Sequence, residues 1–262
     1  MSGFSAEWLA LREPADTAAR APQVTEAVAT AMAGRTPLRV ADLGCGTGSN
    51  VRYLASRLPQ PQAWRLLDHD AALLATARTL VPQAVDTRVA DLRVLDAAAF
   101  AGCDLVTASA LLDLVSEAWV RRFALLCRDA GAAVLVVLNY DGRTECTPHD
   151  ADDDAVRALV NAHQRSDKGF GPALGPDSGP RTAQALTDAG YRVIVKKSDW
   201  VIGPDQAELQ RQLIAGWADA AVELAPAECG RIRAWQSRRL AYVDAGTSTV
   251  RVGHDDVGGV LG

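Results

Sequence analysis

The hydrophobic pattern of the chain predicts strands and helices in alternation. Seven short apolar runs bounded by turn residues predict buried strands, at residues 38–43, 64–68, 85–90, 104–108, 132–138, 191–197 and 249–253. Stretches with apolar residues three or four positions apart predict helices at residues 49–58, 70–80, 116–128, 181–189, 205–224 and 227–244. Residues 6–33 have the same helical spacing, and Pro14 and Pro22 predict that they form two helices. This alternation predicts βαβ units, and hence a parallel sheet with helices on both faces.

The pattern breaks between residues 141 and 180. Nine of these 40 positions are Gly or Pro, and the only regular feature is a short helix that begins at Asp152-Asp153-Asp154 and runs to about Gln164. A loop begins at Gly169-Phe170-Gly171-Pro172. Long irregular connections in compact domains are typically covers or binding loops, so we predict that this segment is a lid over a substrate site.

Charge and apolar length argue against two classes of partner. The net charge is −5, and the 27 basic residues (24 Arg and 3 Lys) are scattered along the chain, which disfavours a nucleic-acid substrate. The longest apolar run, residues 132–138, is far shorter than the roughly 20 residues that cross a membrane. Residues 1–8 lack the basic-then-apolar order of a secretory signal. We therefore expect a cytoplasmic protein that binds neither nucleic acid nor membrane.

The most specific signal is a glycine-rich turn between the first predicted strand and the helix after it. Residues 40–48 read Val-Ala-Asp-Leu-Gly-Cys-Gly-Thr-Gly. Glycine permits a positive φ and close approach of a ligand to the backbone, and the following helix start offers unpaired N–H groups. A dinucleotide fingerprint G-x-G-x-x-G would place its third glycine at position 49, which is Ser49. This disfavours a NAD-binding oxidoreductase, which stays as an alternative.

The string D-L-G-C-G-T-G at residues 42–48 resembles motif I of the class I S-adenosylmethionine-dependent methyltransferases. The resemblance extends from about Leu38 to Leu138, because three further positions match in order after successive predicted strands: Asp68, Asp91-Leu92 and Ser109-Ala110-Leu111-Leu112. The whole sequence is also similar to a bacterial subgroup with an L-R-E-P-A-D start and an H-Q-R-S-D-K-G-F-G-P-A-L-G-P lid. No substrate follows from that likeness.

The resemblance implies a fold and a division of the chain. We expect one Rossmann-like, doubly wound α/β domain, with a seven-stranded, mostly parallel sheet whose last strand is antiparallel. Residues 1–36 would form an N-terminal helical cap, residues 37–140 the cofactor-binding core, and residues 141–180 the lid. Residues 181–262 would complete the sheet around a helical insertion at residues 204–246.

The resemblance also implies S-adenosylmethionine as the cofactor and S-adenosylhomocysteine as its product. Asp68 would accept both ribose hydroxyls, Asp91 would hold the adenine amine, and Asp42 would orient the loop and the cofactor's ammonium group. Arg12 would pair with the methionine carboxylate, or is an exposed surface residue. The predicted cofactor-binding set is Arg12, Asp42, Gly44, Cys45, Gly46, Gly48, Asn50, Asp68, His69, Asp91, Leu92, Ser109 and Ala110.

Two residues are candidates for the catalytic base. His163 ends the predicted lid helix in a polar run, and histidine readily exchanges a proton near neutral pH. It is equally well explained as an exposed helix-terminal residue. Asp113, just past the fourth strand, is either a base, a binding group for a cationic substrate, or the cap of the helix after it. The predicted substrate-binding residues are Tyr140, Arg143, Lys168 and Phe170, with Trp200 as another candidate wall.

We predict no metal site. His69-Asp70 is best explained by a helix cap at Asp70, and His149 and the His254-Asp255-Asp256 run by solvated surface residues. The five cysteines are odd in number, widely spaced and without a C-x-x-C pair, which predicts reduced thiols. Asn139-Tyr140 resembles half of the N-P-P-Y motif of enzymes that methylate amino groups of nucleic acids, but it follows the fifth strand instead of the fourth.

The predicted function is that of an enzyme, an S-adenosylmethionine-dependent methyltransferase acting on an O, N or S nucleophile of a small molecule. In-line transfer depends mostly on alignment and exclusion of water. A non-catalytic module that binds the cofactor keeps every motif and is the main alternative. A methyltransferase of protein or RNA is disfavoured by the acidic balance.

Overall fold

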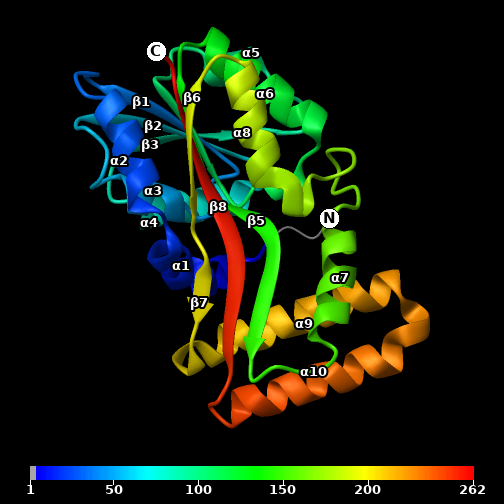
Figure 1. The fold of residues 1–262 in the computed structure, drawn as a ribbon. Helices are drawn as coiled ribbons and strands as arrows, with labels where there is room; N and C mark the ends of the chain where they lie inside the picture. Colours follow the sequence, from blue (N-terminus) through cyan, green and yellow to red (C-terminus); the bar gives the residue numbers. More distant parts are fainter. Residues whose placement is uncertain (1–3) are drawn as a thin grey trace.

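The computed structural model describes residues 4–262 and is built around one eight-stranded sheet (Figure 1). Residues 1–3, part of the segment behind the cytoplasmic prediction, lie outside the described residues. The strands are β1 (Leu38–Leu43), β2 (Gln62–Asp68), β3 (Val85–Val89), β4 (Leu105–Ser109), β5 (Ala133–Thr147), β6 (Arg192–Lys197), β7 (Trp200–Ile202) and β8 (Thr249–Val260). Their order in the sheet is β3-β2-β1-β4-β5-β8-β6, with β7 paired to β8.

The sheet has the predicted strand directions. Strands β1 to β5 pair in parallel, and β8 runs antiparallel to both β5 and β6. The prediction of a Rossmann-like, mostly parallel sheet with an antiparallel last strand is confirmed. The eighth strand, β7, was not predicted, because three residues carry too little periodicity to identify a strand.

The helices largely follow the predicted positions. They are α1 (Ala6–Ala19), α2 (Pro22–Ala31), α3 (Ser49–Leu54), α4 (Ala71–Leu80), α5 (Ala97–Phe100), α6 (Glu117–Asp129), α7 (Asp153–Gln164), α8 (Ser178–Asp188), α9 (Ala207–Leu224) and α10 (Cys229–Asp244). Short 3₁₀ turns are η1 (Leu112–Leu114), η2 (Gly175–Asp177), η3 (Pro204–Gln206) and η4 (Pro226–Glu228). Pro14 lies inside α1, so the prediction that it interrupts the helix is wrong. Asp70 caps α4 as predicted, since its carboxylate accepts from the N–H groups of Ala72 and Leu73.

Helices cover both faces of the sheet (Figure 1). Side chains alternate across each strand, so neighbouring residues enter different cores. Val40 of β1 packs in the core under α2, α3 and α4, whereas Ala41 packs in the core under α5, α6 and α8. None of the helices within residues 4–262 combines the length and the apolar character that crossing a membrane requires.

Strands β5 and β8 continue beyond the sheet as a long antiparallel pair and reach the helices α7, α9 and α10 (Figure 1). These helices share a separate apolar core that includes Val160, Ile214 and Trp235. The predicted end of the fifth strand at Leu138 is wrong, because the chain passes through a bulge between Tyr140 and Thr144 and then pairs again. Gly142 lies in this bulge at a φ of 84°, a conformation that glycine adopts without strain.

The segment predicted as a lid is therefore divided. Residues 141–147 belong to β5, and α7 packs against α9 through Val156 and Val160 instead of lying loosely over the sheet. The irregular parts are residues 148–152, before α7, and most of the stretch between α7 and α8, which includes Phe170.

Candidate active site

The glycine turn lies at the carboxyl end of β1, where the strand order reverses between β1 and β4. Ligands of open α/β sheets bind at such a point. Gly44, Gly46 and Gly48 have φ values of 63°, 52° and 82°. A Cβ on Gly48 would lie 2.6 Å from Val81 Cγ2, and one on Gly46 would lie 2.9 Å from Leu9 Cδ1. The turn thus requires glycine, and α1 covers it through Leu9.

Asp68, at the end of β2, is tied to this turn. The Gly46 N–H donates to Asp68 Oδ2 at 2.9 Å, and the Asp70 N–H donates to Oδ1 at 3.0 Å. His69 Nδ1 lies 3.2 Å from Oδ1, with its side chain mostly exposed. The N–H groups of Gly44 and Cys45 donate to the carbonyl of Leu67, and Cys45 is buried. The predicted residues of β1 and β2 are therefore brought together, and each Asp68 oxygen keeps capacity for a further hydrogen bond.

Asp42 is fully buried beneath the turn. Its Oδ1 accepts from Asn50 Nδ2 at 2.8 Å, and Asn50 also donates to Thr107 Oγ1 at 3.1 Å. Among residues 4–262, Oδ2 of Asp42 has no hydrogen-bond partner. Burial raises the pKa of Asp42 to about 7. An unpaired buried carboxylate is costly, so this oxygen suits a cationic ligand group such as an ammonium.

Two arginines of the N-terminal cap behave differently. Arg12, the predicted carboxylate ligand, donates to Asp16, and its guanidinium lies 4.8 Å from the ring centroid of Trp200. Arg20 follows α1 and is buried, and its Nη1 donates to Asn50 Oδ1 at 2.9 Å. Its Nε lies 3.6 Å from Asp256, and neither Nε nor Nη2 has a hydrogen-bond partner within the described chain. Arg20 therefore has the donor capacity that the prediction assigned to Arg12.

A hollow of about 170 Å³ lies beside the ends of β1, β2 and β3. Its walls include Leu43, Leu67, Asp91 and Leu92. Two of these are the predicted adenine-binding residues. The Asp91 carboxylate is exposed and accepts from Arg93, which lowers its pKa to about 2.

The end of β4 carries a strained residue. Ala110 has a φ of 51°, which is unfavourable for any residue with a Cβ, and its N–H donates to the Val137 carbonyl at 3.0 Å. Such strain clusters at ligand-binding segments. It turns the chain after Ser109 toward η1, which contains Asp113.

Beyond this turn, five buried or half-buried side chains from separate elements form what we call the β5–β8 cluster: Arg12, Asp113, Tyr140, Trp200 and His254. The His254 ring centroid lies 5.1 Å from that of Trp200 and 6.3 Å from that of Tyr140. The charge of Arg12 acts on both Asp113 and His254. The cluster therefore joins α1 and η1 to the β5–β8 pair.

The two titratable groups of the β5–β8 cluster are strongly perturbed. Burial raises the pKa of Asp113 to about 6, and burial together with Arg12 lowers the pKa of His254 to about 3. Across residues 4–262, neither Asp113 Oδ1 nor His254 Nδ1 finds a hydrogen-bond partner. Perturbed, unpaired polar groups in a buried cluster are typical of a functional site.

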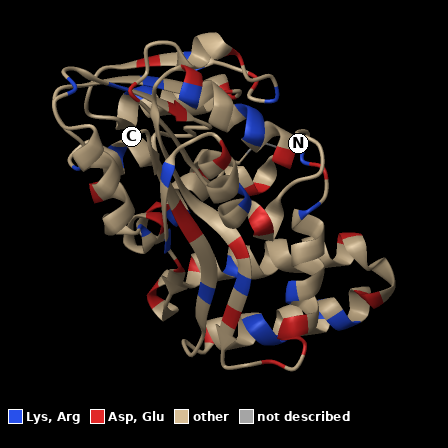
Figure 2. Ribbon diagram, turned by 45° about the horizontal axis from the view of Figure 1, so that its top comes forward, with Lys and Arg blue, Asp and Glu red and all other residues tan. Residues whose placement is uncertain are grey.

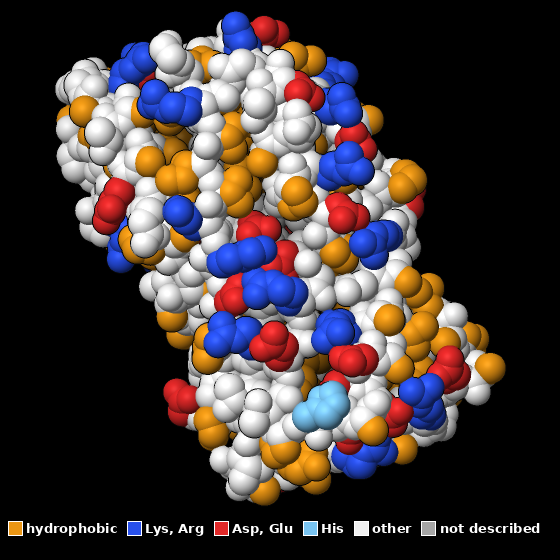
Figure 3. Space-filling model, viewed as in Figure 1, with side chains coloured by type: hydrophobic (Ala, Val, Ile, Leu, Met, Phe, Trp, Pro, Cys, Tyr) orange, Lys and Arg blue, Asp and Glu red, His pale blue; other side chains and the backbone are white. Residues whose placement is uncertain are grey.

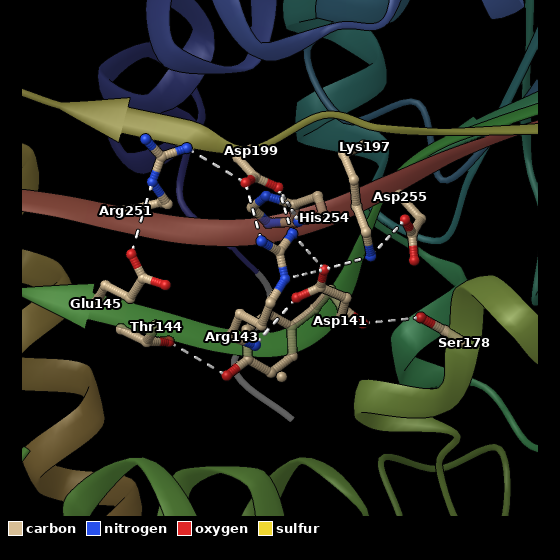
Figure 4. Close-up of polar contacts among 12 residues, drawn as sticks. Asp141, Arg143, Thr144, Glu145, Ser178, Lys197, Asp199, Arg251, His254 and Asp255 are labelled. Atoms are coloured by element: carbon tan, nitrogen blue, oxygen red, sulfur yellow. Dashed lines mark hydrogen bonds and ion pairs between the residues drawn. The ribbon is translucent and has the colours of Figure 1, made fainter. Parts of the chain in front are cut away.

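On the outer side of β5 and β8, acidic and basic side chains form a mixed patch near the middle of the molecule (Figure 3). Arg143 contacts Asp141 and Asp199, each at 2.6 Å, and Lys197 bridges Asp141 and Asp255, each at 2.9 Å (Figure 4). The predicted substrate residue Arg143 is thus fully engaged in a network that holds the strands in register.

The contacts given below for the predicted lid residues His163, Lys168 and Phe170 are made with residues outside the β5–β8 cluster. His163 Nε2 is 3.1 Å from Glu223 Oε2 of α9, and its Nδ1 is 3.3 Å from Lys168 Nζ. Phe170 packs edge-to-face on Trp119, with centroids 6.2 Å apart. Among the contacts described, none joins His163 to the glycine turn. Tyr140 does reach the lid helix, because its hydroxyl donates to Asn161 Oδ1 at 2.7 Å.

Sequence reasoning missed Arg20, His254 and Asp256. The interpretation of the His254-Asp255-Asp256 run as solvated is wrong, since all three are buried. Asp256 accepts from the N–H groups of Ala21 and Leu138, each within 2.9 Å. An apolar pattern on both sides, Val250 and Val257, was the available signal that these polar residues lie inside a strand. Within residues 4–262, no three His, Cys, Asp or Glu side chains are grouped to hold a metal ion.

Comparison with known proteins agrees with this geometry. Residues 40–131 match the family described as "Methyltransferase domain". A trans-aconitate 2-methyltransferase from Mycolicibacterium gilvum (strain PYR-GCK) is 33% identical over 174 residues, which cover 64% of this chain and 63% of the relative. The matched part thus spans less than two thirds of that protein.

Two solved structures share the fold at low identity. A protein described as a methyltransferase from Bacillus halodurans superposes with a TM-score of 0.52 at 12% identity, covering 92% of this chain and all of the other. The mycolic acid cyclopropane synthase CmaA1 superposes with a TM-score of 0.50 at 12% identity, covering 98% of this chain and all of the other. S-adenosylmethionine is the cofactor of the family, as the sequence predicted. The family match therefore places a methyltransferase domain at residues 40–131, and the two superpositions show that the chain as a whole shares the fold of those proteins.

Proposed function

We propose that the chain transfers a methyl group to an O, N or S nucleophile of a small molecule. When bound, S-adenosylmethionine supplies a methyl group on a sulfonium sulfur, which leaves with the bonding electron pair. The observation that carries the proposal is the enclosure of the glycine turn: Leu9 of α1 lies directly over Gly46, while the polar groups of the β5–β8 cluster are buried. An enclosed site suits a small acceptor and excludes water.

The residues around the turn fit the cofactor. Asp68 would receive the ribose hydroxyls and Asp42 the ammonium group, because each retains carboxylate lone pairs at the turn. Arg20 would receive the methionine carboxylate, because its Nη2 has no partner in residues 4–262 and a guanidinium binds carboxylates well. Asp91 and Leu92 would bound the adenine.

Asp113 is the group that we assign to accept a proton from the nucleophile. It is buried in the middle of η1, and its raised pKa of about 6 leaves it ionised yet basic at neutral pH. Burial removes the carboxylate from water and favours its neutral form, while the nearby Arg12 charge acts in the opposite direction and favours the ionised form. His163 remains a second candidate, with its contacts directed to Glu223 and Lys168.

Two observations support a small acceptor over a macromolecule. Basic and acidic residues are interspersed over the ribbon instead of forming one basic face (Figure 2). The name of the 33% identical relative also refers to a small molecule, trans-aconitate. We further propose that residues 37–140 form the cofactor part and that the segment after Tyr140 contributes to the acceptor side.

Two measurements test the proposal. Calorimetry measures the binding of S-adenosylhomocysteine, and a turnover assay measures the formation of S-adenosylhomocysteine from S-adenosylmethionine with a panel of small acceptors that includes trans-aconitate. We expect Asp68→Ala to weaken binding by about 1–3 kcal/mol, because buried hydrogen-bond partners are lost. Asp68→Asn, which keeps the shape and one acceptor oxygen, should lose less. An unchanged dissociation constant in Asp68→Ala would remove this residue from the ribose site. Cofactor binding without turnover on any acceptor would favour the non-catalytic module, and NAD binding alone would contradict the proposal.

A further inference from the structure

His254 occupies the carboxyl edge of the sheet close to the proposed cofactor site. Leu43 of β1 pairs with Ala108 of β4, and Ser109 of β4 pairs with Val137 of β5. Tyr140 of β5 pairs in turn with His254 of β8. Neighbouring strands lie about 4.8 Å apart, so His254 is roughly 10 Å across the edge from β4. That is the side of the glycine turn away from the predicted adenine and ribose residues.

The backbone around His254 is held firmly in place. The Ser198 N–H donates to the His254 carbonyl at 2.9 Å, and the His254 N–H donates to Asp199 Oδ1 at 3.4 Å (Figure 4). Asp199 in turn binds Arg143, which also binds Asp141. The ring itself lies between Trp200 and Tyr140, on the side of the sheet that α1 covers.

Despite this fixed position, one ring nitrogen is unsatisfied. His254 Nδ1 has no hydrogen-bond partner anywhere in residues 4–262. The charged groups that act on the ring come from three elements: Arg12 of α1, Asp141 of β5, and Asp199 before β7. With the nearby Arg12 charge and deep burial, the ring is neutral at physiological pH. A buried nitrogen without a partner costs about 1–3 kcal/mol, which a ligand hydrogen bond would recover.

We propose that His254 Nδ1 accepts a hydrogen bond from the nucleophilic nitrogen of the methyl acceptor, and that the acceptor is therefore a primary amine. This inference rests on the proposed function and narrows its substrate class. Two buried atoms of the β5–β8 cluster have no hydrogen-bond partner within the described chain, Asp113 Oδ1 and His254 Nδ1, and the second is an acceptor in the tautomer that carries its hydrogen on Nε2. A primary amine has two N–H groups and satisfies both atoms. A hydroxyl has one hydrogen and leaves one of the two atoms without a donor, and a carboxylate satisfies neither and would lie beside the Asp113 charge.

The chemistry balances with the residues present. One N–H of the acceptor amine donates to His254, which orients the nitrogen lone pair toward the methyl carbon. As the new nitrogen–carbon bond forms, the carbon–sulfur bond would break with its electron pair leaving on sulfur, and the proton of the other N–H passes to Asp113, which becomes neutral. His254 does not take the proton, because the buried ring next to Arg12 is a poor site for a positive charge. We therefore treat His254 as a specificity-determining residue and Asp113 as the base.

The test uses sinefungin, a cofactor analogue that carries a primary amine in place of the transferred methyl group. The probe places N–H donors at the position of the transferred methyl group, directed toward the residues that would surround the nucleophile. We measure its affinity and that of S-adenosylhomocysteine by calorimetry, and we take the ratio as the preference for sinefungin. The wild-type chain should prefer sinefungin. His254→Leu should lower that preference about tenfold, the value of one hydrogen bond to a charged donor, while the affinity for S-adenosylhomocysteine stays within about twofold.

Matched variants separate the hydrogen bond from packing. His254→Asn places an amide group near the position of Nδ1 and should keep most of the preference, whereas His254→Gln places its amide farther out and should lose it. Equal preference in the wild type and His254→Leu would overturn the inference, as would a wild type that binds both compounds equally. If His254→Leu fails to fold, the Asn and Gln pair decides: equal preferences in these two overturn it. Failure of the wild type to bind S-adenosylhomocysteine would instead be a failure of the proposed function.

Discussion

Two buried arginines, Arg20 and Arg239, differ in how completely the protein satisfies them. Arg239 of α10 donates through Nε to Asp153 Oδ1 at 2.9 Å and through Nη1 to the Pro148 carbonyl at 2.5 Å, and its Nη2 also donates to Asp153. Arg20 makes one hydrogen bond, to Asn50, and leaves Nε and Nη2 without partners in residues 4–262. Both side chains are almost fully buried.

The difference separates a structural ion network from a binding one. The Arg239 network joins α10 to the start of α7, and Trp235 Nε1 completes it by donating to Asp153 at 2.8 Å. Such a network has no capacity left for a ligand. The Arg20 network includes Asp42 and lies under the glycine turn with both positive and negative groups incompletely paired. An amino acid zwitterion, with one carboxylate and one ammonium, would complete it.

The largest expected effect is on stability, from the satisfied network. Arg239→Met should lower the free energy of unfolding by about 3–5 kcal/mol, because it leaves a buried carboxylate unpaired. We expect the folded fraction to bind S-adenosylhomocysteine with unchanged affinity. Urea denaturation and calorimetry check both parts. A large loss of ligand affinity with little loss of stability would reverse the assignment of the two networks.

The next largest effect is on ligand binding, from the incomplete network. Arg20→Met should weaken S-adenosylhomocysteine binding by about 1.5–3 kcal/mol, the range for hydrogen bonds to charged groups. Stability should fall less than in Arg239→Met, because Asp256 keeps the N–H groups of Ala21 and Leu138. The control ligand is 5′-methylthioadenosine, which lacks the amino acid part and should bind both proteins equally. If Arg12→Met loses more S-adenosylhomocysteine affinity than Arg20→Met, and keeps its affinity for 5′-methylthioadenosine, then Arg12 is the residue that binds the carboxylate.

A smaller effect is expected from pH. The pKa of Asp42 is raised to about 7 in the folded chain, against an ordinary value near 3.9. The folded state therefore holds an extra proton between these values, and this residue's contribution to stability falls as pH rises through that range. The ammonium group of the ligand needs the carboxylate form, so S-adenosylhomocysteine affinity should rise by up to about tenfold per unit as pH increases toward 7 and then level off. Calorimetry from pH 5.5 to 8.5 measures this. If the affinity of Asp42→Asn for S-adenosylhomocysteine does not change with pH, the titration belongs to Asp42. If the affinity of this variant changes with pH as steeply as that of the wild type, the assignment is wrong.

The same division explains what the sequence could predict. Gly44, Gly46, Gly48 and Asp42 lie in one short segment whose local chemistry already requires a tight turn. Asp68 could be found because the carboxyl end of β2 lies beside that of β1 in any sheet of this type. Strands β1, β4 and the first half of β5 could be placed because they are largely buried and appear as apolar runs.

The β5–β8 cluster could not be found in this way. His254 lies beside Tyr140 because β5 and β8 pair beyond the ends that the local pattern predicted for them, Leu138 and Gly253. The choice between Arg12 and Arg20 likewise depends on tertiary structure. Arg12 faces Trp200 of β7, while Arg20 follows the end of α1 and turns toward Asn50. Contacts between distant segments decide these roles, and periodicity does not record them.

The smallest expected effect concerns His163. Its ring has hydrogen-bond partners within the protein, unlike the groups that we assign to ligand binding, so we predict that it has no catalytic role. Both of its ring nitrogens have partners, Glu223 and Lys168, and Glu223 is largely exposed. An exposed pair of this kind contributes about 0–1 kcal/mol, so His163→Ala should leave turnover within about twofold and stability nearly unchanged. The measurement is the maximal rate of methyl transfer beside S-adenosylhomocysteine affinity, with Asp113→Asn as the variant expected to lose the rate. A drop of more than about tenfold in the rate of His163→Ala, at unchanged cofactor affinity, would assign the catalytic role to His163 in α7. It would also show that a side chain whose hydrogen-bonding atoms all have protein partners in the ligand-free chain can still take part in catalysis.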